Sequence, residues 1–232
     1  MMDRDMTSKK ALALESAFCK LLQQMEFKKI TVSRVCSDAH VSRATFYTYF
    51  DSTQALLDEI EDRTLADIMQ ILEGWKYFGY SSVGENKAAP VYLDISRYCY
   101  KQREVFQALF GPYGDEAFIY RYESRIYEDF MRFVKAAGDV RYPELMASSC
   151  AGAIIALCRT WFSNISLATA EELALLHTAI VYRIIHSADS FSEVLQPKDQ
   201  TPRGKKGASA DERDENHWNW WNRGQLFKTE WD

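Results

Sequence analysis

A short stretch near the N-terminus combines the side chains best suited to contact nucleic acid. Its small, hydroxyl-bearing and basic members are Ser42, Arg43, Ala44, Thr45, Tyr47, Thr48 and Tyr49. A surface that enters the major groove needs short polar or basic groups, because the groove presents hydrogen-bonding base edges between rows of phosphates. The Arg43 guanidinium can bind a guanine edge or a phosphate, and Tyr and Thr hydroxyls can donate to phosphate oxygens. The stretch therefore predicts a DNA-contacting helix.

Helical patterns on both sides can position this stretch. Residues 9–25 place apolar side chains at i, i+3, i+4 and i+7, which gives one stripe facing a core. Thr31, Ser42 and Ser52 each stand where they can cap a following helix. The residues spaced to anchor the third helix in a core are Val41, Phe46 and Phe50. Two short helices joined by a tight break, the second rich in hydroxyls, predict a helix-turn-helix.

The rest of the chain is also predicted to be helical. A loop rich in Gly, Ser, Asn and Pro at 74–90 precedes four apolar helical patterns, at 91–110, 115–137, 143–166 and 170–190. No stretch alternates with period two for long enough to predict a strand. We expect an all-α fold, in which a three-helix N-terminal helix-turn-helix head is joined by a long fourth helix to a helical body.

The expected domains follow from these patterns and from composition. Residues 1–52 are predicted to be the helix-turn-helix DNA-binding domain, and residues 53–190 a helical regulatory and dimerisation domain. Residues 191–232 are rich in charge and poor in apolar side chains before a tryptophan-rich end, and are predicted to be poorly ordered.

Composition and charge fit a DNA-binding globular protein. Residues 1–50 carry eight Lys/Arg against five Asp/Glu, although the net charge of the whole chain is −5. No apolar run approaches the ~18 residues of a membrane span, and the charged start does not resemble a signal peptide, so we expect a cytoplasmic protein. The five cysteines form no CxxC pair and are expected to be reduced and buried.

The segment ITVSRVCSDAHVSRATFYTYFDSTQALL, Ile30 to Leu57, resembles the TetR family of transcription regulators, with helix 9–25 also in register. The resemblance implies nine or more helices, with the fourth linking a DNA-binding head to a ligand-binding and dimerising body. It implies phosphate contacts from Thr31, Ser42, Tyr47, Tyr49 and Thr53, and base or groove contacts from Arg43, Ala44, Thr45 and Thr48. The implied function is a repressor that a small-molecule ligand releases from, or resets on, a double-stranded DNA operator.

Three positions depart from the family pattern. His40 occupies a turn that is usually glycine, and Glu26 replaces the usual glycine after helix 1. Thr53 stands where a phosphate-binding lysine is common, which removes one salt-sensitive contact and predicts weaker operator binding. These departures keep an alternative open: a protein-interaction module or co-activator on the same fold that does not itself read DNA.

The body carries patterns for a homodimer and for a ligand pocket. Two wide apolar helix faces, at 143–166 and 170–190, predict a four-helix interface between two copies of the chain, unless they only close the monomer core. The candidate interface residues are Ile154, Ile155, Trp161, Ile180 and Ile184. Aromatic side chains crowd the middle of the chain and are equally natural as core or as pocket walls. The candidate pocket residues are Tyr98, Phe106, Phe110, Tyr122 and Trp161.

The chemistry of the body is otherwise open. Four arginines, at 97, 121, 125 and 159, can meet an anionic ligand or serve as solvated or paired charges. The order YCYKQREVFQALFG, AGAIIALCRTWFSN and TAEEL resembles a TetR subgroup related to regulators of dihydroxyacetone kinase operons, which names no ligand. No HExxH, glycine-rich phosphate loop, GxSxG or paired His/Cys ligand motif occurs, so the sequence predicts no enzyme activity, no cofactor and no metal.

Overall fold

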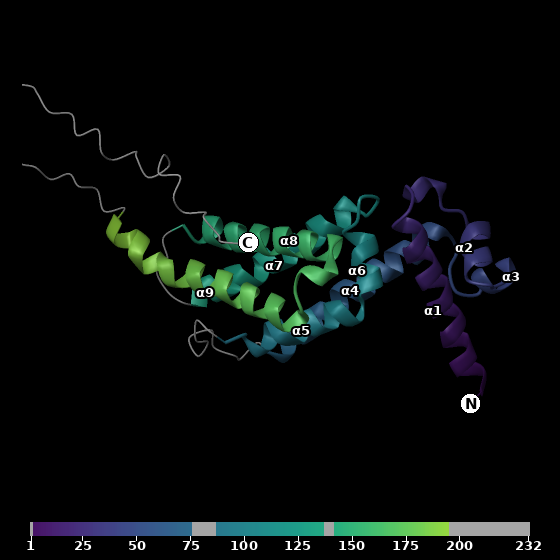
Figure 1. The fold of residues 1–232 in the computed structure, drawn as a ribbon, viewed down its shortest axis with the longest axis horizontal. Coiled ribbons are helices and arrows are strands. Elements are labelled where there is room, and N and C mark those ends of the chain that lie inside the picture. The colour runs from purple at the N-terminus through teal and green to yellow at the C-terminus, as the bar shows by residue number, and fades with distance from the viewer. Residues whose placement is uncertain (1, 76–86, 137–141, 195–232) are drawn as a thin grey trace, which may run out of the picture. The chain divides into compact units, whose positions relative to one another are not determined.

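The computed structural model describes residues 2–75, 87–136 and 142–194, and within those ranges it holds nine α-helices and no strand (Figure 1). The predicted all-α fold class is confirmed for these residues. Part of the predicted loop, residues 76–86, and most of the predicted tail, from residue 195 onward, lie outside the described residues.

The N-terminal helices are held by local capping and by one apolar core. They are α1 (Met2–Leu22), α2 (Val32–Asp38) and α3 (Arg43–Phe46), with a short 3-10 helix η1 (Phe27–Lys29) after α1. Each predicted cap is confirmed: Thr31 Oγ1 accepts from the Arg34 amide at 3.3 Å, Ser42 Oγ from Thr45 at 3.1 Å and Ser52 Oγ from Ala55 at 3.0 Å. The largest buried side chains here are Leu14, Phe18, Leu22, Val35, Phe46 and Leu56.

The third helix is shorter than its apolar pattern suggests. It ends at Phe46, and the chain continues to Phe50 in turns, where the Phe50 amide still donates to the Phe46 carbonyl at 3.0 Å. Phe46 and Phe50 are both buried with their rings 5.7 Å apart, so both anchor this segment as predicted.

Five helices form the body. They are α5 (Pro90–Lys101), α6 (Arg103–Leu109), α7 (Glu116–Ala136), α8 (Pro143–Ser163) and α9 (Ala170–Val194), with a 3-10 helix η3 (Ile165–Leu167) before α9. Helix α7 packs against α8, and α5 packs against α9. The single helix expected at 91–110 is two helices, because Gln102 (φ −98°, ψ 23°) leaves the helical region. The other three predicted body helices agree with the structure to within four residues, whereas α1 begins at Met2, before the predicted start at residue 9.

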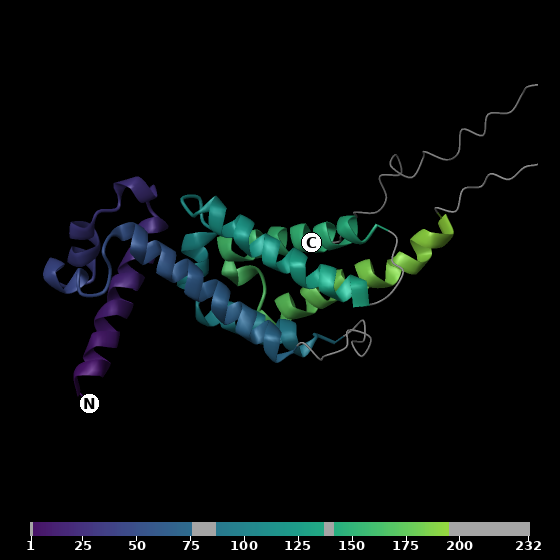
Figure 2. The same cartoon turned by 180° about the vertical axis from the view of Figure 1, so that it is seen from behind.

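Helix α4 (Thr53–Gly74) belongs to both groups of helices. It starts beside α3 and runs on to α5, against which it packs (Figure 2). Its buried side chains extend from Leu56 to Ile68, so apolar packing continues along the helix from one group to the other. The division into residues 1–52, 53–190 and 191–232 stays a prediction.

Helix α8 is the one described helix that is long and apolar enough, by length and composition alone, to cross a membrane. Core helices of globular proteins satisfy the same criterion. Here Ala147, Ala151 and Ile154 are buried, and α8 packs against α7 and α9, so its apolar character serves the core. The five cysteines, expected to be reduced and buried, are all buried free thiols.

Candidate nucleic-acid interface and ligand cavity

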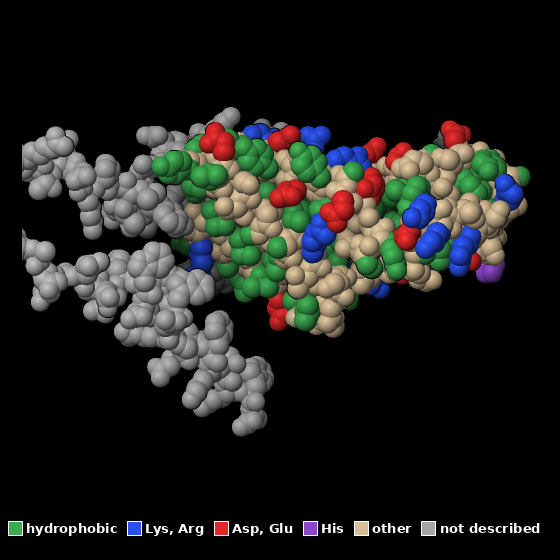
Figure 3. Space-filling view, turned by 90° about the horizontal axis from the view of Figure 1, so that it is seen from above, with side chains coloured by type: hydrophobic (Ala, Val, Ile, Leu, Met, Phe, Trp, Pro, Cys, Tyr) green, Lys and Arg blue, Asp and Glu red, His purple; other side chains and the backbone are tan. Residues whose placement is uncertain are grey.

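The outer face of the α3 segment carries the side chains predicted to enter the groove. Arg43, Ala44, Tyr47 and Thr48 are exposed, and half of the Tyr47 side chain is accessible (50%). No described residue forms an ion pair with Arg43, which leaves its guanidinium available to a phosphate or a base edge. Figure 3 shows Lys and Arg side chains gathered over α1 to α3 on the face that it draws. A basic, hydroxyl-bearing face of this kind can bind the DNA backbone.

Several of the predicted contact residues also hold the local structure. Ser42 and Thr31 cap α3 and α2, although both stay exposed. The Thr48 hydroxyl donates to the Thr45 carbonyl at 2.6 Å, so only its acceptor side remains for DNA. The members that are only half exposed are Thr45, Tyr49 and Thr53, and Tyr49 packs against the core. Seven of the nine predicted residues thus lie at or directly after α3, whereas Thr31 caps α2 and Thr53 begins α4, and the DNA contacts of all nine remain a prediction.

The turn between α2 and α3 has a left-handed residue. His40 has φ 54°, the region in which glycine is favoured and other residues are strained. The glycine that is usual at this turn in the TetR pattern implies such a backbone conformation, and His40 adopts it. The Val41 amide donates to the Cys36 carbonyl at 2.9 Å across this turn, which sets where α3 begins relative to α2.

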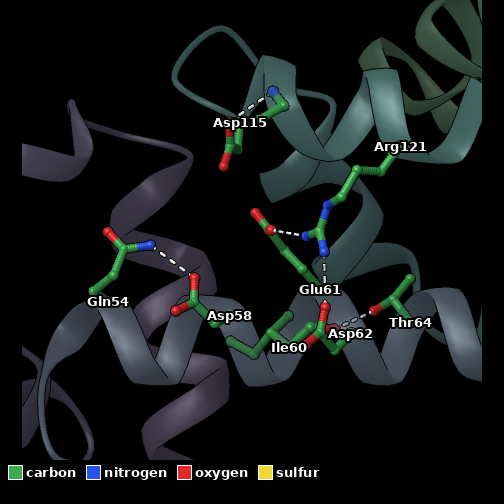
Figure 4. Close-up of polar contacts among 9 residues, drawn as sticks. Gln54, Asp58, Ile60, Glu61, Asp62, Thr64, Asp115 and Arg121 are labelled. Atoms are coloured by element: carbon green, nitrogen blue, oxygen red, sulfur yellow. Dashed lines mark hydrogen bonds and ion pairs between the residues drawn. The ribbon is translucent and has the colours of Figure 1, made fainter.

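Charged side chains in the middle of α4 tie it to two other helices. Arg121 of α7 donates to Glu61, and to Asp62 at 2.8 Å (Figure 4). The residue of α4 that follows Asp62, Arg63, donates to both carboxylate oxygens of Glu15 on α1, at 2.8 and 2.5 Å. Glu15 and Glu61 are both buried, so each relies on its arginine partner for compensation of its charge.

The environment of Glu61 disfavours its ionised form. Burial, together with the charge of Asp115, raises the pKa of this carboxyl to about 7 against the opposing effect of Arg121. Figure 4 shows Asp115 on the segment that leads into α7, on the same side of α4 as Arg121. Glu61 is therefore a titratable group in the contact between α4 and α7.

A cavity of about 60 Å³ lies between α4, α5, α7, α8 and α9. Its walls are mostly apolar, and they comprise Ile68, Leu72, Tyr92, Ile95, Tyr122, Ile126, Asp129, Phe130, Ile154 and His177. Two polar side chains, Asp129 and His177, interrupt these walls. Neither residue could be identified from the sequence, because a lone Asp or His on a helix gives no signal until other helices are packed around it.

Most of the predicted pocket residues lie elsewhere. Of the five, only Tyr122 lines the cavity. Phe106 and Phe110 belong to a packed aromatic core, where Phe106 stacks on Phe162 with ring centroids 4.8 Å apart. The Trp161 indole donates to the Ala168 carbonyl at 2.8 Å and is buried. These three rings are packed in the core and do not line the cavity.

Tyr98 also faces away from the cavity walls. Its hydroxyl donates to Asp67 of α4 at 2.8 Å. Burial and this bond raise the pKa of the Tyr98 phenol, which stays protonated. Tyr98 therefore connects α5 to α4, and it does not line the cavity.

The predicted interface residues divide between core and surface. Ile154, Ile155 and Trp161 are at most 6% exposed within the single chain, because α8 turns them toward its neighbours. Ile180 and Ile184 are half-buried. An interface on these helices would therefore use the exposed side of α8, and Ile154, Ile155 and Trp161 would support it only from beneath.

Comparisons with known proteins were made for sequence and for structure. Residues 16–60 match the family model of bacterial regulatory proteins, tetR family. Among proteins of curated function, no sequence is significantly similar to this chain. A TetR transcriptional regulator from Streptococcus agalactiae 2603V matches at a TM-score of 0.52 and 22% identity, over 78% of this chain and 98% of that one. A tetR-family transcriptional regulator from Streptomyces coelicolor matches at 0.55 and 14%, over 81% and 85%.

The dihydroxyacetone kinase operon activator DhaS is also similar, with 20% identity and a TM-score of 0.47 over 78% of this chain and 97% of that one. This likeness is too loose to decide a subgroup. The first two structures are similar enough to establish the fold, and both are described as transcriptional regulators.

The Glu61 environment predicts a pH-dependent contribution to stability. Its folded-state pKa of about 7 lies above its ordinary value of 4.5, so the favourable contribution of the neutral carboxyl is complete below pH 4.5 and is lost as the pH rises through about 7. The variant Glu61→Gln keeps a neutral group. Relative to the parent it should gain roughly 2–3 kcal/mol in free energy of unfolding between pH 4.5 and pH 8. Urea denaturation across this range measures the difference, and a difference that does not change with pH would contradict the assignment.

Proposed function

The chain carries the N-terminal domain of the TetR family of transcription regulators on the fold of that family, and from this premise we propose that it represses transcription by binding an operator as a homodimer until a small-molecule ligand releases it. The observation that carries the proposal is the exposed α3 segment. Arg43 and Tyr47 project from it, while Phe46 and Phe50 fix its other side in a core. This is the arrangement that a recognition helix requires.

The charge distribution supports the DNA-binding part of the proposal. Residues 1–50 have an excess of three positive charges, whereas the rest of the chain is acidic. An end with positive charge and a body with negative charge favour approach to DNA through α1 to α3 only. Thr53, half-buried at the start of α4, supplies no cation, so the affinity would rest more strongly on Arg43 and the hydroxyls.

Exposed apolar side chains on α9 and small ones on α8 support the homodimer. Leu176 is 47% exposed and lies one turn before Ile180 on the same stripe of α9. The outer stripe of α8 includes the exposed Ser149 and Ala156 and the half-buried Ala153, whose small side chains allow another helix to approach closely. A dimer would present two α3 segments to the two halves of a palindromic operator.

The DNA-reading role predicts the effect of two substitutions. Full-length protein titrated against DNA from upstream of its own gene should bind it more tightly than shuffled DNA of the same length, with an affinity that falls steeply as salt rises. Arg43→Ala and Tyr47→Ala should each weaken binding roughly tenfold. Arg125→Ala and Tyr120→Ala, which remove exposed residues of the same types from α7, should bind like the parent.

Equal binding to upstream and shuffled DNA, or full affinity in the Arg43→Ala and Tyr47→Ala variants, would reject the DNA-reading role. Either result would favour the alternative of a protein-interaction module.

The homodimer predicts the effect of a charge on α9. Leu176→Arg should convert the dimer to monomers, because a buried unpaired cation costs more than the contact at this position contributes. Leu167→Arg is the matched control, since Leu167 is also exposed (61%) but lies in η3, outside the proposed interface. Sedimentation equilibrium measures the mass. A dimeric Leu176→Arg variant, or a monomeric parent, would refute the proposed interface.

A further inference from the structure

The chemistry of the cavity between α4, α5, α7, α8 and α9 narrows the class of ligand. Most of its walls are hydrocarbon, with Ile68, Ile95 and Ile126 facing it from three helices. Such walls bind the apolar part of a ligand through burial of its surface. The polar groups that interrupt the walls then decide which functional group the ligand carries.

His177 is the most strongly buried of these polar groups. Its side chain, on α9, is 3% exposed, and neither ring nitrogen has a hydrogen-bond partner among the described residues. The Tyr92 ring lies beside it, with centroids 5.7 Å apart. Burial lowers the pKa of His177 to about 4, so at neutral pH the ring has one N–H donor and one acceptor nitrogen. A buried imidazole without partners favours a ligand that supplies a hydrogen bond.

Asp129 is the second polar group of the cavity. One of its oxygens pairs with Arg132 on the next turn of α7. The other oxygen, Oδ2, is buried and has no partner among the described residues. A carboxylate can only accept hydrogen bonds, and its negative charge repels anions. Asp129 therefore favours a ligand that donates a hydrogen bond.

The basic side chains that could have received an anionic ligand are engaged elsewhere. No Lys or Arg is among the described residues that line the cavity. Arg97 pairs with Glu171 at 3.1 Å, and Arg159 pairs with Glu116 at 2.7 Å. Arg121 pairs with Glu61 and Asp62, and Arg125 with Glu128. The electrostatics of the cavity thus disfavour carboxylates and phosphates.

The size of the cavity limits the ligand further. The enclosed space of about 60 Å³ is several times the roughly 10–15 Å³ that a cavity needs to hold one water molecule. Leu72 and Asp129 are only half-buried, so a ligand has room to extend past them. A compact molecule fits the enclosed part of this space.

We propose that this cavity binds a compact, uncharged alcohol, with its hydrocarbon part against the isoleucines and its hydroxyl paired with His177. A hydroxyl is both donor and acceptor, so it matches a neutral imidazole in either tautomer, and it introduces no charge beside Asp129. This assignment rests on the proposed function, because it identifies the class of the ligand that would release the operator.

The test compares three probes of similar size: cyclopentanol, cyclopentane and cyclopentanecarboxylate. Each is titrated into the full chain without DNA, and binding is followed by the ¹⁵N resonances of the His177 imidazole. Cyclopentanol should bind roughly tenfold more tightly than cyclopentane, because cyclopentane leaves the imidazole without a partner. Cyclopentanecarboxylate should not bind.

Two variants separate a hydrogen bond from simple filling of space. His177→Phe keeps a ring of similar size and should lose the preference for cyclopentanol over cyclopentane, as measured by displacement of a ¹⁹F-labelled cyclopentane from the cavity. Tyr120→Phe, which removes an exposed hydroxyl of α7 outside the cavity, should keep that preference.

Equal affinity for cyclopentanol and cyclopentane, tighter binding of the carboxylate, or unchanged His177 resonances with all three probes would overturn the proposal. Because no DNA is present, these outcomes are independent of operator binding. Failure of the DNA titration with intact cyclopentanol binding would reject the regulator function and leave the alcohol site standing.

Discussion

Helix α4 is fixed by charged side chains at its middle while its two ends serve different parts of the molecule. Toward its start, Leu56 and Ile60 are buried in the core shared with α1 to α3. Toward its end, Ile68 and Leu72 form one wall of the cavity. Between them, Glu61 and Asp62 pair with Arg121 of α7, and Arg63 pairs with Glu15 of α1. A movement of α4 that accommodated a ligand would therefore have to shift or break these pairs, in which the Glu61 and Glu15 carboxyls are buried.

This arrangement suggests how the proposed ligand would act at a distance. A ligand favours one state of a protein only through contacts that differ between states. Repacking at Ile68 changes the position of α4, and the Arg63–Glu15 pair carries that change to α1. Because α1 and α2 position the α3 segment, the placement of Arg43 for DNA would change with it. Reciprocity then requires that DNA alter the affinity of the cavity for its ligand.

The features predicted well from sequence are those that depend on neighbours in the chain. The caps at Thr31, Ser42 and Ser52 depend on an amide three residues away, and the left-handed turn at His40 lies within a segment specific to the TetR family. The cavity could not be predicted, because aromatic residues at helical spacing are equally compatible with core and with pocket. Phe106 is core because Phe162 of α8 stacks on it, and Trp161, on α8 itself, is core because its buried indole donates to the Ala168 carbonyl. The isolated His177 had no sequence signal, because the cavity that it lines is formed by side chains from four other helices.

The central claim is that α4 connects the cavity to the DNA-binding helices. The most direct test measures the operator affinity of a variant that is altered far from α3. Arg121→Gln removes the partner of Glu61 and Asp62, and DNA binding is measured where the variant is fully folded. We expect its operator affinity to fall severalfold, corresponding to roughly 0.5–2 kcal/mol of coupling. Arg125→Gln, one turn along α7 with an exposed pair to Glu128, should bind like the parent. An Arg121→Gln variant with the operator affinity of the parent would contradict a role for α4 in carrying the ligand signal to the DNA-binding helices.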